Sequence, residues 1–288
     1  MKSNADVRGC ADLHTHSTAS DGTFSPSELV LQAKKAGLRA IALTDHDTLS
    51  GLREFCFTCR ENGIEGIPGV EIGAKYKSEM HILGLFVDYE NPEFAAVLEE
   101  LSRARAERNY KMLEKFQQDG FDLTEEDILS QKGDRDMNSC GRVHFAAVLV
   151  KKGYAADHND AFARFIGRDQ PYYVKRKAYP PDKVIQLIHS AGGLAVLAHP
   201  IYISKDERIL EKVLAELCES GLDGLESYYS QYTPEFTEVC LRLCEKFDLL
   251  PTGGSDFHGK NKPNIPIGVV DGGMGVPYRV VEDLKKRR

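Results

Sequence analysis

The sequence predicts an α/β fold in which seven strands form an incomplete barrel and a helical insertion interrupts the strand–helix order. Three observations support this prediction. Short apolar strands alternate with amphipathic helices before residue 92 and again after residue 180, a rhythm typical of parallel sheets with crossover helices. The stretch between these parts has helical periodicity only. Nearly every predicted strand carries or precedes His, Asp or Glu, as expected where strand ends meet on one face of a barrel.

The first part of the barrel is predicted to contain four strands and two helices. Ser25 caps the first helix, Pro26 occupies its first position, Glu28 completes a capping box, and Gly37 ends the helix. The second helix is predicted at 50–62, and the strands at 10–11, 39–44, 65–72 and 80–87.

The predicted insertion contains helix 94–118, a helix capped by Thr124, and helices 143–152 and 157–166. The barrel rhythm then returns, with strands at 194–198, 224–225 and 249–252 between helices at 181–191, 206–220 and 234–247. We therefore predict a discontinuous barrel domain, residues 1–91 and 175–288, and a helical insertion or cap domain, residues 92–174. The basic end of the chain, 285–288, is interpreted as a helix end whose cations lie near its carbonyl groups.

Composition excludes several classes of protein. The net charge of −7 argues against a surface for extended duplex nucleic acid. No apolar run approaches the roughly 20 residues that span a bilayer, and the amino terminus has no apolar signal core. We therefore expect a cytoplasmic protein without a membrane contact. The odd number of scattered cysteines agrees, and the pair Cys56 and Cys59 lies in a predicted helix, where packing is the favoured interpretation.

Two polar clusters suggest a metal site. Asp12-Leu13-His14-Thr15-His16 and Thr44-Asp45-His46-Asp47 each follow a short apolar run. Side chains two apart in a strand share a face, so the first cluster presents two imidazoles together. Neutral His is a common ligand for Zn, Mn and Fe. The alternative, a hydrogen-bonded polar loop above the core, explains one such cluster better than two.

Further candidate ligands follow the other strands. The full set is His14, His16, Asp21, Asp45, His46, Glu71, His81, His199, Asp256 and His258. Imidazole and carboxylate without thiol suit Mn, Fe or Zn better than Mg or Ca alone. A set of this size is sufficient for two or three divalent ions, and ions that lie close together typically clamp a phosphoryl group and bridge its nucleophilic oxygen.

These motifs, together with Asp21-Gly22-Thr23, Gly69-Val70-Glu71, Ala198-His199-Pro200 and Gly254-Ser255-Asp256-Phe257-His258, resemble those of the polymerase-and-histidinol-phosphatase (PHP) family of metal-dependent phosphoesterases. The resemblance implies a distorted seven-stranded β/α barrel with a trinuclear site. The first metal would take His14, His16, Glu71 and Asp256, the second Glu71, His81 and His199, and the third Asp21, His46 and His258. It implies catalytic roles for Asp45, His46, His199 and Asp256, with Asp12 and Asp45 orienting imidazoles from behind. Asp21 replaces a His of some relatives, which favours Mn²⁺, with Zn²⁺ and Fe²⁺ as alternatives.

Within that family, Ser139–His144 and the motif around His199 resemble a branch with a helical insertion. That branch trims short RNAs from the 5′ end and removes the 3′-phosphate of 3′,5′-bisphosphonucleotides. The resemblance implies a small phosphorylated substrate, a nucleotide or short oligonucleotide, whose second phosphate binds Arg142 and His144. Val143 stands where the branch usually has Pro, and an ion pair at a helix start is the alternative role for Arg142.

Three other functions are considered. A phosphatase for a small metabolite such as histidinol phosphate is disfavoured by the insertion. A metal-binding module without turnover would lack ligands, and none is missing. An amidohydrolase would need a bridging Lys after a strand, and no predicted strand exit supplies one. Glu226 either supports a ligand or faces the substrate, and the run 175–177 is a candidate phosphate contact, with solvated charge as the default interpretation.

Overall fold

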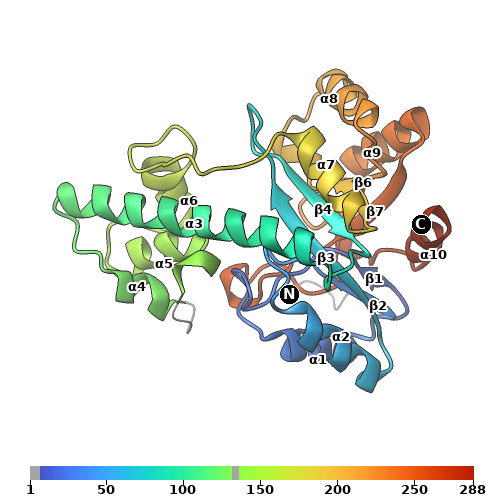
Figure 1. Ribbon diagram of the computed structural model, residues 1–288, viewed down its shortest axis with the longest axis horizontal. Helices are drawn as coiled ribbons and strands as arrows, with labels where there is room; N and C mark the ends of the chain where they lie inside the picture. The colour runs from blue at the N-terminus through green and yellow to red at the C-terminus, as the bar shows by residue number, and fades with distance from the viewer. Residues whose placement is uncertain (1–6, 132–135) are drawn as a thin grey trace. The chain divides into compact units, whose positions relative to one another are not determined.

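The computed structural model describes residues 7–131 and 136–288, which fold into two compact units. The barrel unit contains the chain up to Ala96 together with Ala178–Arg288, and the helical unit contains Val97–Lys177. The first boundary falls inside the long helix α3 (Pro92–Gln118), because the first turn of this helix packs with the barrel unit. Figure 1 shows the elements of both units. No helix among the described residues is long and apolar enough to cross a membrane.

Seven strands form one sheet in which each strand lies beside its successor in the chain. They are β1 (Ala11–Asp12), β2 (Ala40–Leu43), β3 (Glu65–Gly73), β4 (His81–Leu85), β5 (Leu194–Leu197), β6 (Gly224–Tyr229) and β7 (Leu250–Gly254). The N–H of Leu13 donates to the carbonyl oxygen of Gly253 at 3.0 Å, which joins the first strand to the last. The sheet is therefore a nearly closed barrel, and the predicted seven-stranded α/β barrel is confirmed.

The direction of β4 differs from the prediction of an all-parallel sheet. It runs antiparallel to both β3 and β5, whereas the other neighbouring pairs are parallel. The physical reason is the short connection 74–80, because a parallel crossover needs roughly a dozen residues or more. As a result the first residue of β4, His81, pairs with Gly73 at the end of β3. His81, although it begins its strand, therefore lies at the same rim of the barrel as the carboxyl ends of the parallel strands.

Helices lie outside the strands of the barrel unit, as Figure 1 shows. They are α1 (Pro26–Ala36), α2 (Leu52–Asn62), α7 (Pro181–Ser190), α8 (Glu207–Glu219) and α9 (Pro234–Phe247). The predicted capping box of Ser25 and Glu28 is present, and Gly37 ends α1 at a φ of 81°. In α1 the buried side chains include Pro26, Leu29 and Ala33, which share one face because helical side chains three or four apart lie together.

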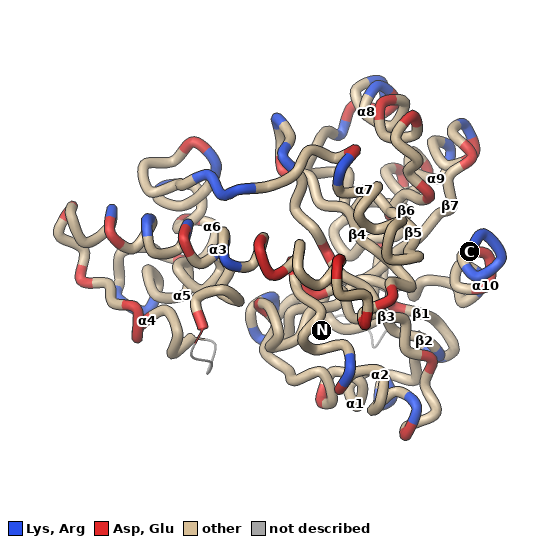
Figure 2. The backbone as a smooth tube through the Cα atoms, viewed as in Figure 1, with Lys and Arg blue, Asp and Glu red and all other residues tan. Residues whose placement is uncertain are grey.

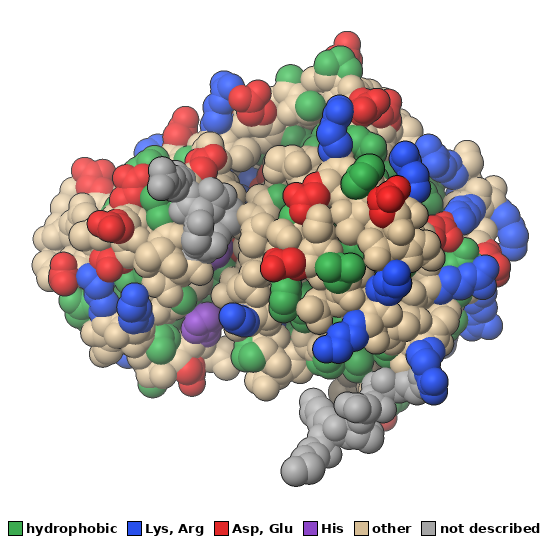
Figure 3. All heavy atoms as spheres, turned by 90° about the horizontal axis from the view of Figure 1, so that it is seen from below, with side chains coloured by type: hydrophobic (Ala, Val, Ile, Leu, Met, Phe, Trp, Pro, Cys, Tyr) green, Lys and Arg blue, Asp and Glu red, His purple; other side chains and the backbone are tan. Residues whose placement is uncertain are grey.

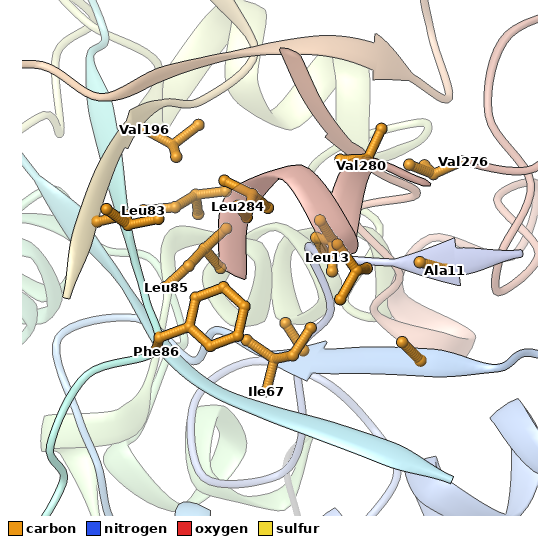
Figure 4. Packing of buried hydrophobic residues seen from close by; sticks show 14 of the residues in the cluster. Ala11, Leu13, Ile67, Leu83, Leu85, Phe86, Val196, Val276, Val280 and Leu284 are labelled. Carbon is orange, nitrogen blue, oxygen red and sulfur yellow. The ribbon is translucent and has the colours of Figure 1, made fainter. Parts of the chain in front are cut away.

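The last helix, α10 (Arg279–Arg287), packs against the interior of the barrel. Figure 4 shows Val280 and Leu284 pointing toward side chains from the strands. Each such side chain contributes roughly 1.5–3 kcal/mol when it is fully buried. Tyr278 Oη donates to Glu65 Oε2 at 2.6 Å, and Lys285 pairs with the same carboxylate. Because Glu65 is the first residue of β3, α10 covers the end of the barrel opposite to the rim.

The helical unit has its own hydrophobic core. Besides α3 it contains α4 (Glu125–Ser130), α5 (Arg142–Lys151), α6 (His158–Ala161) and a π-helical turn, Phe162–Ile166. Phe116 stacks on Tyr172 with ring centroids 3.9 Å apart, so this tyrosine is a packing residue. Cationic and anionic residues are interspersed along α3 in Figure 2.

Candidate metal centre

The predicted ligands of the barrel unit converge on one rim. His14 and His16 follow β1, His46 follows β2, Glu71 lies near the end of β3, and His199 follows β5. The remaining members lie in loops or at a strand start, namely Asp21, His81, Asp256 and His258. Apart from His46 and His81, these side chains are at least nine-tenths buried. Ligands separated by more than two hundred residues in the sequence are therefore neighbours in space.

Glu71 lies at the centre of this arrangement and is 1% exposed. Its Oε2 atom lies 3.2 Å from ring nitrogens of His14, His16 and His46. Its Oε1 atom lies 2.7 Å from Nδ1 of His81 and 2.9 Å from Nε2 of His199. One carboxylate thus faces five imidazoles, which is the arrangement expected of a carboxylate that bridges two ions.

Two further carboxylates complete the cluster. Asp256 Oδ1 lies 3.3 Å from Nδ1 of His258 and 3.5 Å from Nε2 of His16. Asp21 Oδ1 lies 3.2 Å from Nε2 of His258, and its Oδ2 lies 3.8 Å from Nε2 of His46. The imidazoles of His16 and His258 stack with centroids 4.1 Å apart. These contacts link the groups around Glu71 to those around Asp21.

The donor atoms lie close enough together to bind metal ions, and three of the ring nitrogens have no hydrogen-bond partner. Four overlapping groups have ligand atoms within 4.8 Å of one another: His16-Asp21-His46-His258, His14-His16-Asp256, His14-Glu71-His199 and His46-Glu71-His81. The Nε2 atoms of His14 and His16 and the Nδ1 atom of His199 are buried without a hydrogen-bond partner. Buried polar atoms are normally satisfied, so these three nitrogens fit the role of metal ligands.

The groups shift each other's pKa strongly. Burial lowers the pKa of His16, but Asp256 and Glu71 outweigh burial and raise this pKa to about 9. Burial likewise lowers the pKa of His14, while Glu226 and Glu71 raise it well above the ordinary value. For Glu71, burial raises the pKa, but His46, His81 and His14 bring it well below the usual range. The carboxylates are thus ionised and ready to bind cations.

Three buried carboxylates support the cluster. Glu226, which lies within β6 and not after it as predicted, has Oε1 2.9 Å from Nδ1 of His14, and its Oε2 accepts the backbone N–H of His199 at 2.6 Å. Glu226 therefore supports ligands. Asp12 accepts hydrogen bonds from Ser255 and from the backbone N–H of Gly268.

Asp45 accepts hydrogen bonds from the hydroxyl groups of Ser17 and Ser20 and from the backbone N–H of Ser17. These contacts fix the loop that follows His16. Asp12 and Asp45 thus hydrogen-bond to loop residues, and Ser20, bound to Asp45, lies with its Oγ 3.4 Å from Nδ1 of His16; that these two carboxylates orient imidazoles, as the family resemblance implies, stays a prediction. Glu226 contacts the imidazole of His14 directly, on the side away from Glu71. A carboxylate in this position is common around metal-binding His.

The backbone at two predicted ligands adopts left-handed conformations. His199 has a φ of 27° and Asp256 a φ of 58°. Such conformations cost about 1–3 kcal/mol outside glycine and tend to lie at functional sites. The backbone N–H of Asp256 donates to the carbonyl oxygen of His14 at 2.9 Å, which holds the strained residue beside β1. Close approach is possible because Gly254 has no Cβ, which would lie 2.4 Å from Cβ of His14.

The sequence patterns missed Lys262. Its Nζ donates to Asp256 Oδ2 at 2.6 Å, and Tyr229 Oη donates to the same oxygen at 2.8 Å. Lys262 lies in the segment that follows β7, beyond the strand exit. It pairs with an outward carboxylate oxygen and does not bridge the imidazole groups. No motif marks it, because it stands six positions after Asp256 and beyond a 3₁₀ turn, Gly259–Asn261.

Arg142 and His144 belong to the helical unit, at the start of α5. His144 is 2% exposed, and its Nδ1 accepts the backbone N–H of Gly141 at 2.9 Å, so the ring caps the helix. Arg108 lies near three other arginines of this unit, Arg105, Arg142 and Arg176. Burial, followed by repulsion from these neighbours, lowers the pKa of Arg108 well below its usual value. The sequence pattern marks Arg142 and, within the run 175–177, Arg176; the four arginines are called the arginine cluster below.

Comparison with known proteins agrees with this geometry. The PHP domain family model matches residues 12–227. A 5′-3′ exoribonuclease from Haemophilus influenzae is 34% identical over 248 residues, covering 86% of this chain and 89% of that protein. A 3′,5′-nucleoside bisphosphate phosphatase from Chromobacterium violaceum is 28% identical over 258 residues, covering 89% and 90%.

A solved structure of a metal-dependent phosphoesterase from Bifidobacterium adolescentis superposes with a TM-score of 0.85. It is 33% identical, and the match covers 97% of this chain and 96% of that one. The family match spans most of the chain and includes the strands that carry His14, Glu71 and His199. The chain belongs to the PHP domain family, and it is a metal-dependent phosphoesterase.

Proposed function

We propose that this phosphoesterase hydrolyses phosphate esters of nucleotides, either the 3′-phosphate of 3′,5′-bisphosphonucleotides or the 5′ ends of short RNAs. The observation that carries the proposal is the convergence of five imidazoles on Glu71 beside Asp21 and Asp256. The two relatives with these activities cover most of the chain. On the face shown in Figure 3, cationic, anionic and apolar side chains of the described residues are interspersed, which favours a small substrate over an extended duplex.

We propose the ligand sets given by the family resemblance, for two to three divalent ions. His14, His16, Glu71 and Asp256 would hold the first ion, Glu71, His81 and His199 the second, and Asp21, His46 and His258 the third. The four overlapping groups of the structure support sharing between these sets. Carboxylates with imidazoles and no thiol favour Mn²⁺ over softer ions.

Bound divalent ions supply a hydroxide near neutral pH and stabilise charge on the phosphoryl group. The protein's own residues prepare this chemistry. Glu71 and Asp256 place their carboxylates among the imidazoles, and Glu226 fixes the ring of His14 through Nδ1. Asp45 fixes the loop behind His16, so that the ligand positions are established before substrate binds. His46 and His199 would face the reacting phosphate as ligands.

We propose that the arginine cluster, with Arg142 and His144, binds a second phosphate. Arg108 is 6% exposed, and its buried Nε has no hydrogen-bond partner. Burial and repulsion from neighbouring arginines lower the pKa of Arg108, and an anion beside this side chain would offset both effects. Guanidinium forks match phosphate oxygens. In this proposal the barrel domain, 1–91 and 175–288, carries the chemistry, and the insertion domain, 92–174, carries Arg142 and His144.

The test is Mn²⁺-dependent release of inorganic phosphate from a 3′,5′-bisphosphonucleotide. We expect turnover by the native chain, loss of about a thousandfold or more in D256A, and native rates in D283A, which removes an exposed carboxylate of α10. Unchanged turnover in D256A would contradict the proposed function. A panel that includes histidinol phosphate distinguishes a phosphatase of small metabolites from an enzyme that needs the second phosphate.

A further inference from the structure

We propose that Lys262 is a phosphate-binding residue of the metal centre, whose ammonium group contacts the phosphoryl group that is hydrolysed. The inference rests on the proposed function and adds a cation that belongs to the protein itself. Four observations support it: the two oxygens of Asp256 contact different groups, Lys262 is partly exposed, its loop is anchored, and the metal-loaded centre is positively charged.

The two oxygens of Asp256 face different groups. Oδ1 lies 3.3 to 3.8 Å from ring nitrogens of His258, His16 and His14, on the side of the predicted ligands. Oδ2 accepts hydrogen bonds from Lys262 Nζ at 2.6 Å and from Tyr229 Oη at 2.8 Å. The ammonium group is thus separated from the ligand cluster by the width of a single carboxylate.

Lys262 is the accessible member of this pair. Its side chain is 27% exposed, whereas that of Asp256 is 4% exposed and Tyr229 is fully buried. An ammonium group has three donors, and the contact with Asp256 uses one of them. The group can therefore keep this contact and donate to an oxygen of a phosphate that arrives from solvent.

The segment before Lys262 is anchored to the loop that carries Asp21. The side-chain amide of Asn261 donates to the carbonyl oxygen of Asp21 at 2.7 Å, and the backbone N–H of Lys260 donates to Thr23 Oγ1 at 2.9 Å. The position of Lys262 is therefore linked to the loop of a second predicted ligand, Asp21. A cation held in place before substrate arrives loses little freedom on binding.

The charge of the centre separates a phosphate-binding role from simple neutralisation of Asp256. Glu71, Asp256 and Asp21 carry three negative charges, and two or three divalent ions would exceed that number. The ammonium of Lys262 then adds positive charge where the carboxylates are already compensated. This arrangement is unfavourable by itself and becomes favourable with an anion, such as a phosphate dianion.

The experiment measures binding of inorganic phosphate to the Mn²⁺-loaded full-length enzyme by calorimetry, with metal content determined on the same samples. K262M removes the charge and retains a chain of similar length, and K262R retains the charge. K260M is the matched control, because Lys260 is exposed in the same segment. Y229F removes the other donor to Asp256 Oδ2 without a change in charge.

We expect K262M to weaken phosphate binding about tenfold or more, as for the loss of a charge-assisted hydrogen bond. K262R should stay within about threefold of the native chain, and K260M should match it. Y229F should retain phosphate binding. If K262M does not fold, Y229F still shows what happens when Asp256 Oδ2 loses one of its hydrogen bonds. Metal content should be unchanged in every variant.

Native phosphate affinity in K262M with full metal content would overturn the inference. Loss of metal in K262M would also overturn it, because Lys262 would then serve to position Asp256. A large loss of phosphate binding in Y229F with full metal content would assign the effect to the geometry of Asp256. Failure of the proposed function is distinguishable, since it would appear as turnover in D256A whatever the result for Lys262.

Discussion

Nδ1 of His14 lies 2.9 Å from Oε1 of Glu226, and both side chains are fully buried. The contact fixes the imidazole so that its Nε2 faces Glu71 at 3.2 Å. It also connects two strands, since His14 follows β1 and Glu226 lies in β6. The same carboxylate accepts the backbone N–H of His199, so one residue behind the ligands sets the position of two of them.

We therefore expect E226Q to weaken metal binding about 10–100-fold, because it removes the negative charge that supports His14. Competition with a chelator of known affinity measures the effect. E238Q is the control, since Glu238 is exposed on α9. Equal Mn²⁺ affinities in E226Q and the native chain would show that Glu226 has no part in metal binding.

Replacement of Glu71 should have a larger effect than replacement of any other single ligand. Its two oxygens face five imidazoles, so E71Q should reduce the number of bound ions and abolish turnover. Elemental analysis of the purified variant gives the number of ions for each chain. E61Q, at an exposed position of α2, should keep the native metal content. An unchanged metal content in E71Q would contradict the bridging role.

Metal binding should release protons. Although burial lowers the pKa of His16, Asp256 and Glu71 raise it to about 9, so this ring is an imidazolium in the metal-free protein at neutral pH. A metal ion binds neutral imidazole and must displace that proton. The apparent affinity for Mn²⁺ should therefore increase with pH up to about 9. Calorimetry in two buffers with different ionisation enthalpies counts the protons, and a count of zero at pH 7 would contradict this picture.

Gly254 should not tolerate a side chain. A Cβ at this position would lie 2.4 Å from both Cβ and the backbone nitrogen of His14, so G254A should separate β7 from β1. We expect a loss in the free energy of unfolding of about 1–3 kcal/mol, as for overpacked cores, and a loss of metal binding. G192A is a useful comparison, because Gly192 has a φ of 67° but open space around its Cβ. G192A should keep full metal binding. Chemical unfolding measures the stability of both variants, and Mn²⁺ titration measures their metal binding.

Removal of Arg108 should stabilise the substrate-free protein and weaken substrate binding. The buried Nε of Arg108 has no hydrogen-bond partner, and neighbouring arginines repel this side chain. We expect R108M to raise the free energy of unfolding by about 1–2 kcal/mol and to raise KM for a bisphosphorylated nucleotide more than KM for a monophosphate. K111M, on the exposed face of α3, should change neither quantity. A destabilised R108M with native KM values would assign a purely structural role to the arginine.

Local patterns predicted most elements of the fold. The capping box of Ser25 and Glu28 and the stop at Gly37 depend on residues within one or two helical turns. For the same reason the bounds of α9, Pro234–Phe247, agree with the sequence prediction. The direction of β4 depends on where the chain returns after a short connection, and the parallel rhythm of the other strands does not contain this information.

The sequence by itself determined the kind of chemistry. Imidazole and carboxylate residues in short motifs such as His14-Thr15-His16 are local features, and their ligand preferences follow from their atoms. Only the tertiary structure decided that Glu71 faces five imidazoles, that Glu226 supports His14, and that Lys262 reaches Asp256. These relationships join residues from different strands and loops, and their distances are set by the packing and register of the whole barrel, which no local pattern contains.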